Sequence, residues 1–152
     1  MAADLFPFID GHNDVLLKLH VRGEGARPFL GRRDEGHLDL VRANEGGFAA
    51  GFFAVFVQPE SEEERAATKI PDGTPPYAQP LAGPIPTEYA AREAGAMIDL
   101  LDELAAAGGV RAGRTVADVE AALNGGPPAA ILHFEGAEPI EPSLENLEGF
   151  YA

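Results

Sequence analysis

The sequence predicts an α/β fold built on a parallel β-sheet. Three short apolar segments have the composition of strands, at residues 6–12, 51–57 and 129–134. Helical patterns lie between them, and strands that alternate with helices along the chain are typical of a parallel sheet. The segment GFFAVFV, residues 51–57, is apolar on both faces, as expected of a strand that helices cover on both sides.

The composition is that of one ordinary globular domain. The chain has 152 residues, of which 45% are hydrophobic. A domain of roughly 150 residues buries about 70% of the surface that its unfolded chain exposes, so a substantial core is expected. Gly fills 18 positions and Pro 13, which favours many short elements joined by turns.

The charge and the missing residue types exclude several classes of function. A formal net charge of -14 would repel nucleic acid and anionic membrane surfaces, so neither is expected as a partner. Without cysteine, ligands for a transition metal must come from His, Asp and Glu. The start MAADLFPF lacks the positive charge of a secretory signal, and the apolar run 48–57 is far shorter than the roughly 20 residues that cross a bilayer. We therefore expect a soluble, cytoplasmic protein.

The remaining elements can be assigned in order. After the first strand no clear pattern is present up to residue 36, and a short helix is predicted at 38–44. The segment 58–86 contains seven of the thirteen prolines and is predicted to be a loop excursion. Such a segment is either a mobile linker, a segment with a task at the mouth of a site, or variable decoration.

Three helices are predicted in the second half of the chain. Thr87 begins a helix with apolar residues at the i, i+3, i+4 spacing of a face laid on a sheet, and Gly108 follows its end. The spacing from Thr115 to Asp118 is that of a capping box at the start of a second helix. A short last helix is predicted within SLENLEGFYA, where Ser143 is the candidate cap.

The segment IDGHND, residues 9–14, carries three acid or imidazole side chains at the end of the first strand. Because side chains alternate along a strand, Asp10, His12 and Asp14 are predicted to leave the same face. Unpaired charge in a dry site is costly, so such a cluster must be solvated, paired or given a cation. The alternative is a hydrogen-bonded turn in which Asp14 caps the element that follows.

Glu135 follows the third strand, and no basic residue flanks it. The carboxyl ends of parallel strands meet at one edge of the sheet, where the working residues of such folds lie, so Glu135 is predicted to lie near His12 and Asp14. A glutamate can bridge two metal ions roughly 3.5 to 4 Å apart, with a water between them acidic enough to attack an amide or ester carbonyl.

The other histidines have less defined roles. His133 shares the face of Glu135 and is either a hydrogen-bonding partner of a metal ligand or a satisfied core histidine. His20 and His37 lie in polar stretches without a clear pattern, and we expect both on the surface.

Four segments in order along the chain resemble the N-terminal part of the membrane dipeptidase family, also called renal dipeptidases. They are IDGHND, GHLDLVRANEGGFAAGFFAVFV, the long helix from residue 87 and ILHFEGAEPI. The wider amidohydrolase superfamily usually has His-x-His at its first strand, whereas His-x-Asp with a later strand-end Glu-Gly is this family's pattern. The resemblance implies a zinc-dependent dipeptidase of the metal-dependent hydrolase type, built on a (β/α)8 TIM barrel.

Residue roles follow from the resemblance by position. His12 and Asp14 would bind the first zinc, and Glu135 would bridge both zinc ions of a complete site and take part in catalysis. Phe56 would contact the substrate, while Asp10 and His133 would support the ligands. Substrates of the family are dipeptides, often with a D-residue at the carboxyl end, cleaved by a hydroxide that bridges the metals.

The resemblance covers only part of a barrel. A (β/α)8 barrel takes roughly 250 residues, so residues 1–152 are expected to supply the N-terminal part of a single barrel domain, with about its first three strands. The histidines of the second zinc and the family's later arginine and aspartate have no counterpart in the sequence. We expect either a homodimer or association with the missing C-terminal half.

Two alternatives remain at this point. One is a related hydrolase that acts on another amide or on a lactone, and the other is a catalytically silent fragment without the second-metal histidines. The native metal is also open, because His and carboxylate ligands suit manganese, iron or cobalt as well as zinc.

Overall fold

The computed structural model describes residues 6–67 and 83–151, which belong to two compact units. The first unit comprises Met1–Phe56 and Gly95–Glu135, and the second comprises Val57–Ala94 and Gly136–Ala152. All the candidate metal ligands fall within the first unit.

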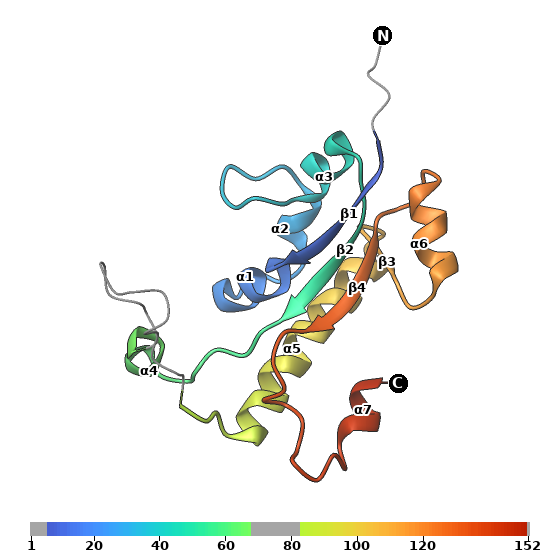
Figure 1. The fold of residues 1–152 in the computed structure, drawn as a ribbon. Helices are drawn as coiled ribbons and strands as arrows, with labels where there is room; N and C mark the ends of the chain where they lie inside the picture. Colours follow the sequence, from blue (N-terminus) through green and yellow to red (C-terminus); the bar gives the residue numbers. More distant parts are fainter. Residues whose placement is uncertain (1–5, 68–82, 152) are drawn as a thin grey trace, which may run out of the picture. The chain divides into compact units, whose positions relative to one another are not determined.

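The first unit is built on a sheet of four parallel strands. They are β1 (Phe8–Asn13), β2 (Phe48–Val55), β3 (Arg111–Ala112) and β4 (Ala129–Phe134). The strand order is β1-β2-β4-β3, and the arrowheads of the three long strands point in the same direction in Figure 1. The carboxyl ends of β1 and β4 therefore lie at the same edge of the sheet, on either side of β2.

Strand β2 forms the centre of the core. It pairs with β4 in unbroken register from Ala50 opposite Ala129 to Val55 opposite Phe134. Phe53 is fully buried, and its ring lies edge-to-face against that of Phe29 at a centroid distance of 6.1 Å. Burial of such side chains is worth about 2 kcal/mol each and fixes the strand between its neighbours.

Short helices surround this sheet. They are α1 (Val15–Arg22), α2 (Arg27–Leu30), α3 (Leu40–Gly46), α6 (Val116–Leu123) and the part of α5 (Thr87–Ala106) from Gly95 onward. Helices α1, α3 and α6 all contact β2. The backbone N–H of Ala26 donates to Glu103 Oε2 at 3.3 Å, which ties the start of α2 to α5.

Helix α3 begins at Asp39, which is fully buried. Burial alone would raise the pKa of Asp39, but hydrogen bonds from the backbone N–H groups of Arg42 and Arg33 and from the Arg42 guanidinium outweigh it, so the pKa is lowered to about 2. At the other end Gly47 adopts a left-handed conformation with φ of 82°, which favours glycine because it has no Cβ.

The second unit contains α4 (Glu62–Ala67), the first part of α5 and α7 (Leu147–Tyr151). Ser61 and Glu64 exchange hydrogen bonds at the start of α4, where Ser61 Oγ accepts from the backbone N–H of Glu64 at 3.1 Å. Before α7, the side chain of Asn146 donates to the carbonyl of Pro139 at 2.8 Å and accepts from the backbone N–H of Glu141 at 2.9 Å.

The predicted parallel α/β sheet is confirmed, and β4 has the bounds that the sequence predicts. The prediction of three strands was incomplete, because β3 has only two residues and carries no periodic signal. The stretch judged to lack a pattern contains α1 and α2, which are too short for their periodicity to stand out.

Three further predictions differ in detail from the structure. The predicted excursion 58–86 contains helix α4, and residues 68–82 of it lie outside the described part of the chain. The last helix is shorter than predicted, and its start is not capped by Ser143. Within residues 6–67 and 83–151, no helix has the length and apolar character needed to span a membrane.

Candidate metal centre

The centre begins where β1 passes into α1. Strand β1 ends at Asn13, its pairing with β2 is irregular between Asp10 and Asn13, and Asp14 is the N-cap of α1. Asp14 therefore lies beyond the strand, and strict alternation along β1 does not explain its position. The turn into the helix nevertheless brings Asp14 Oδ1 within 3.3 Å of His12 Nε2.

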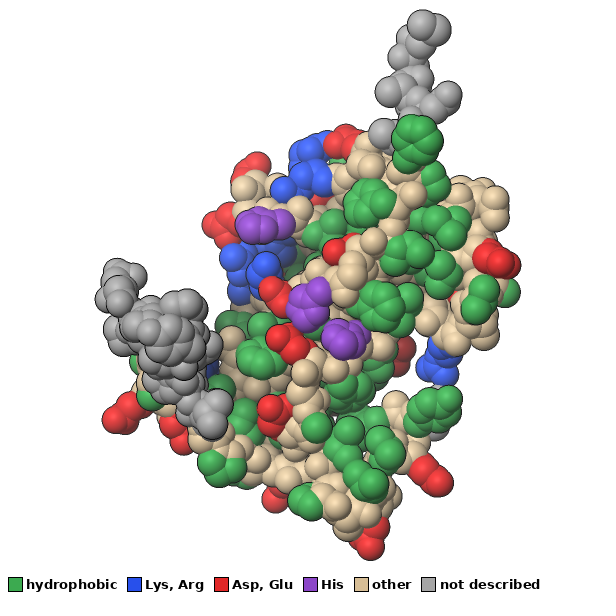
Figure 2. All heavy atoms as spheres, viewed as in Figure 1, with side chains coloured by type: hydrophobic (Ala, Val, Ile, Leu, Met, Phe, Trp, Pro, Cys, Tyr) green, Lys and Arg blue, Asp and Glu red, His purple; other side chains and the backbone are tan. Residues whose placement is uncertain are grey.

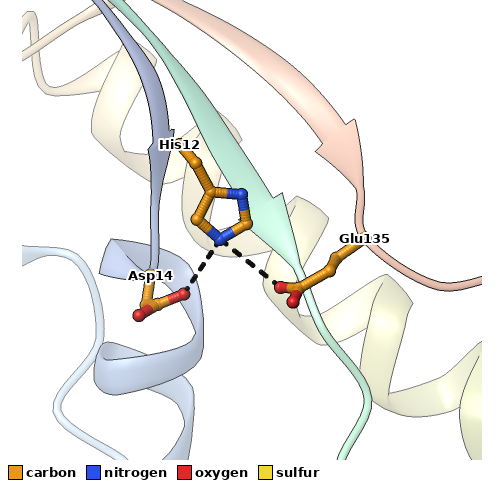
Figure 3. Close-up of side chains that lie close together, drawn as sticks. All are labelled: His12, Asp14 and Glu135. Atoms are coloured by element: carbon orange, nitrogen blue, oxygen red, sulfur yellow. Dashed lines mark hydrogen bonds and ion pairs between the residues drawn. The ribbon is translucent and has the colours of Figure 1, made fainter. Parts of the chain in front are cut away.

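Glu135 reaches the same point from β4. Its Oε2 atom lies 3.4 Å from His12 Nε2, and Figure 3 shows both carboxylates turned toward this one nitrogen. Ligand atoms of His12, Asp14 and Glu135 all lie within 4.8 Å of one another. The structure thus brings together the three residues that the sequence predicts as ligands, although 121 positions of the chain separate Asp14 from Glu135.

The two distances from His12 Nε2 to the carboxylates suit a tetrahedral metal ion. Two ligand atoms that each lie about 2.0 to 2.2 Å from zinc at a tetrahedral angle are roughly 3.3 to 3.6 Å apart. The distances from His12 Nε2 to Asp14 and to Glu135, 3.3 and 3.4 Å, fall in this range. One imidazole nitrogen and two carboxylate oxygens would leave a fourth position for water or substrate.

The side chain of Asp14 is not used by the helix that it begins. No hydrogen bond joins its carboxylate to the first turn of α1, although aspartate is among the strongest capping residues. The alternative prediction that the Asp14 side chain caps the following element is therefore wrong. Its carboxylate points to His12 instead, with Lys18 Nζ at 4.0 Å on its other side.

The imidazole of His12 alone cannot donate good hydrogen bonds to both the Asp14 and the Glu135 carboxylates. Only Nε2 of His12 faces them, and a single N–H cannot point along both directions at once. The side chains of His12, Asp14 and Glu135 are each 41% to 42% exposed, so water reaches the site. A divalent cation would offset both negative charges at one point.

The predicted supporting residues have different neighbours. Asp10 accepts hydrogen bonds from Asn13 Nδ2 at 3.1 Å and from the backbone N–H of His12 at 3.4 Å, so it fixes the end of β1. The ring of His133 lies edge-to-face with that of His12 at 5.7 Å and with that of Phe52 at 5.9 Å. His133 therefore lies beside the His12 ring and limits how it can turn.

Phe56 directly follows β2 and is half-buried. It does not line the cavity beside the candidate ligands, so its contact with substrate stays a prediction.

A cavity of about 190 Å³ opens next to His12 and Asp14, and we call it the α1 pocket. Its wall includes Lys18 of α1 and the exposed residue His37, which the sequence assigns only to the surface. Figure 2 shows Lys and Arg side chains gathered beside His and acidic side chains on this face. No sequence signal marked the pocket, because its residues come from the end of β1, from α1 and α2, and from the segment before α3.

A parallel sheet with a histidine and carboxylates gathered at its strand ends defines a candidate metal-dependent enzyme of the α/β class. The comparison with known families is specific. The sequence profile of the membrane dipeptidase family (peptidase family M19) matches residues 3–152, so the chain belongs to this family.

Two solved structures have the same fold over nearly the whole chain. One is described as the dipeptidase AC, a metallo peptidase of family M19, with 37% identity, a TM-score of 0.79 and 97% of this chain covered. The other is a metallo peptidase from Rhodobacter sphaeroides liganded with a phosphinate mimic of the dipeptide L-Ala-D-Ala, with 37% identity and a TM-score of 0.80 over 97% of this chain.

The chain spans less than half the length of these relatives, 40% of the first structure and 43% of the second. An uncharacterized protein encoded in the PQQ-III 3' region of Acinetobacter calcoaceticus is 31% identical over 95% of this chain and 45% of its own length. The parallel sheet of this chain thus corresponds to part of the fold of M19 dipeptidases.

Proposed function

We propose that this chain supplies the first-metal half of a binuclear zinc dipeptidase, within a (β/α)8 barrel that the remaining strands of the protein complete. The observation that carries the proposal is the convergence of His12, Asp14 and Glu135, with distances from His12 Nε2 to both carboxylates that fit zinc. That Asp14 makes no capping bond supports it further, since the carboxylate is left available to a metal.

Membership of the M19 family supports the reaction type. The Rhodobacter sphaeroides relative is liganded with a dipeptide mimic, and the other relative is described as a dipeptidase. Because this chain spans less than half of those proteins, dipeptide hydrolysis is proposed for the whole protein of which these residues form a part.

The proposed roles follow from the geometry. When bound, zinc supplies Lewis acidity and a water acidic enough to attack a peptide carbonyl near neutral pH. His12 would give the Nε2 lone pair, Asp14 one carboxylate oxygen, and Glu135 both oxygens, one for each of two ions. Asp10 would hold the end of β1, and the His133 ring would keep the His12 ring in its present orientation.

The test is a zinc titration of dialysed protein by calorimetry, with Glu135→Gln compared with Glu120→Gln. Glu120 is an exposed acid on α6 of the same unit, so the two variants remove the same charge. We expect wild type and Glu120→Gln to bind zinc alike, and Glu135→Gln to bind it at least about 100-fold more weakly, since even indirect support of a ligand is worth 10- to 100-fold. Equal affinity in all three proteins would refute the ligand assignment.

Substrate profiling separates the dipeptidase proposal from its relatives. The zinc-loaded protein is assayed with L,L and L,D dipeptides and with lactones of similar size. Hydrolysis of dipeptides supports the proposal, and hydrolysis restricted to lactones overturns it in favour of another amidohydrolase activity. If the protein binds zinc but hydrolyses none of these substrates, residues 1–152 bind the metal without being catalytically active by themselves.

A further inference from the structure

We propose that the α1 pocket binds the side-chain carboxylate of an acidic residue in the substrate. The pocket shares His12 and Asp14 with the candidate metal centre, so a ligand at the metal lies beside its opening. The placement of a dipeptide there rests on the proposed function, whereas the affinity of the pocket for a carboxylate does not.

The pocket has an apolar floor and a cationic rim. Its floor is formed by apolar side chains, namely Val15, Leu19, Phe29 and Leu38. Its rim carries the basic side chains Lys18, Arg22, Arg33 and His37, and the carboxylates of Asp14 and Glu35 also line the pocket. A short methylene stem that ends in a carboxylate matches this arrangement, because the stem buries apolar surface while the anion meets the rim.

The size of the pocket sets the size of the ligand. Drug-sized ligands occupy pockets of roughly 300 to 1,000 Å³, and this cavity of about 190 Å³ is smaller. It suits one side chain, such as that of glutamate or aspartate, rather than a whole dipeptide.

A metal in the neighbouring centre would make the pocket more positive. Lys18 is half-exposed, and its Nζ lies 4.0 Å from Asp14 Oδ2, at the outer limit of an ion pair. A cation bound by Asp14 would offset the charge of that carboxylate. The ammonium of Lys18 would then be available to another anion at the same edge of the pocket.

Neighbouring carboxylates hold the two arginines in place, and Glu24 lies near both, with its Oε1 atom 3.9 Å from Arg22 Nη1. Arg33 donates from its backbone N–H to the buried carboxylate of Asp39 at 3.0 Å, and its guanidinium pairs with Glu24 at 2.9 Å. Arg22 pairs at 2.9 Å with Glu35, whose side chain is 71% exposed. Such an exposed pair contributes little, so an incoming carboxylate can compete with Glu35 for Arg22.

This concentration of basic side chains is unusual for the chain as a whole. The chain has 11 Lys and Arg residues against 25 Asp and Glu residues, yet this one cavity is lined by three of the basic residues beside two of the acidic ones, Asp14 and Glu35. An acidic substrate would be repelled elsewhere on such a surface and attracted here.

The experiment compares matched dipeptides on the zinc-loaded protein. Ala-Glu and Ala-Gln, and the reversed pair Glu-Ala and Gln-Ala, differ only in the charge of one side chain. We expect the acidic member of at least one pair to bind about 10-fold more tightly in an NMR titration, with shifts at the amides of Lys18, Arg33 and His37, since a charge-assisted hydrogen bond contributes about 1.5 to 3 kcal/mol. Equal binding within both pairs overturns the inference.

The matched variants are Lys18→Gln and Arg111→Gln. Both remove one positive charge from a half-exposed side chain of the first unit, 53% exposed for Lys18 and 47% for Arg111, and Arg111 does not line the pocket. Lys18→Gln is expected to reduce the preference for the acidic dipeptide to less than about 3-fold, and Lys18→Glu to abolish it, because each removes a charged donor. A loss of preference of the same size in Arg111→Gln would point to net charge alone and overturn the inference.

A zinc-free titration separates this inference from the proposed function. Glutarate is the anionic probe and glutaramide its neutral counterpart. Shifts at the pocket amides with glutarate alone support the inference even if zinc fails to bind, in which case only the proposed function falls. The opposite outcome is that zinc binds normally, but the protein neither responds to glutarate nor prefers acidic dipeptides. This result would overturn the inference about the pocket and leave the proposed function unaffected.

Discussion

Two helices of the first unit begin at an aspartate, and the two aspartates are used in opposite ways. Asp39 at the start of α3 is fully buried and accepts hydrogen bonds from the backbone N–H of Arg42 at 2.8 Å and of Arg33 at 3.0 Å. Asp14 at the start of α1 is 42% exposed, and its carboxylate makes no capping hydrogen bond to the helix. Its carboxylate lies against His12 instead.

A position at the start of a helix therefore does not by itself define the role of an aspartate. Both carboxylate oxygens of Asp39 accept hydrogen bonds, one from its own helix and one from the chain before it. Asp39 therefore stabilises the fold, and its carboxylate has few lone pairs left for a ligand. The Asp14 side chain does not cap the first turn of α1. Without such a cap the folded protein is less stable by about 1 kcal/mol than with a capped helix start. That cost is understandable if the carboxylate serves a metal.

The largest expected effect separates the two aspartates by metal binding. Asp14→Asn should weaken zinc binding by more than about 100-fold, because it removes a direct ligand. Its stability without zinc should change by less than about 0.5 kcal/mol, since no capping bond is lost. Calorimetric titration with zinc and urea unfolding measure the two quantities, and a large loss of stability with unchanged zinc affinity would reverse the assignment.

The converse substitution tests the structural aspartate. Asp39→Ala should destabilise the zinc-free protein by about 2 to 3 kcal/mol, because it removes a buried cap and leaves Arg42 without its carboxylate partner. Under conditions in which the Asp39→Ala protein is still folded, its affinity for zinc should stay within a factor of about 3 of that of wild type. An unchanged unfolding midpoint would contradict the role given to Asp39.

The pKa of Asp39 predicts how stability depends on pH. Its pKa is about 2 in the folded protein against an ordinary value of 3.8, so the unfolded chain binds the proton first as pH falls. The ionised Asp39 carboxylate therefore adds about 2 kcal/mol to the free energy of unfolding above about pH 4. This stabilisation is lost as the pH falls from about 4 to 2. Asp39→Asn should lack this part of the acid dependence, whereas Glu120→Gln should retain it in the same urea titrations.

The smallest expected effect comes from a third helix start. Helix α6 has a complete capping box, in which Thr115 Oγ1 accepts from the backbone N–H of Asp118 and the Asp118 carboxylate accepts from that of Thr115. The Thr115 hydroxyl also donates to the Asp118 carboxylate at 2.8 Å, and this bond, with that from the Thr115 backbone N–H, holds the pKa of Asp118 below its ordinary value. Thr115→Ala should cost about 1 kcal/mol in urea unfolding and leave zinc binding unchanged. A change in zinc affinity would mean that helix starts and metal centre are coupled.

Much of the sheet could be predicted because its signals are local. Strands β2 and β4 are continuous apolar runs, and the capping box of α6 is visible as Thr115 followed three residues later by Asp118. The proximity of the candidate ligands His12, Asp14 and Glu135 could also be predicted, since parallel topology brings the ends of separate strands to one edge.

Other features depend on tertiary contacts that leave no local pattern. Asp14 was placed on the strand by its spacing from His12, whereas the chain leaves β1 irregularly and the residue begins α1. The two-residue strand β3 exists only because Arg111 and Ala112 pair with β4. The α1 pocket joins residues from 12 to 38 across two helices, so no spacing in the sequence could reveal it.

The most direct test of the account is anomalous diffraction at the zinc edge from crystals of the zinc-loaded protein. A zinc ion held by the proposed ligands gives a peak about 2.0 to 2.2 Å from His12 Nε2 and from carboxylate oxygens of Asp14 and Glu135. A zinc peak elsewhere, or none at this site under conditions where calorimetry registers binding, would contradict the account.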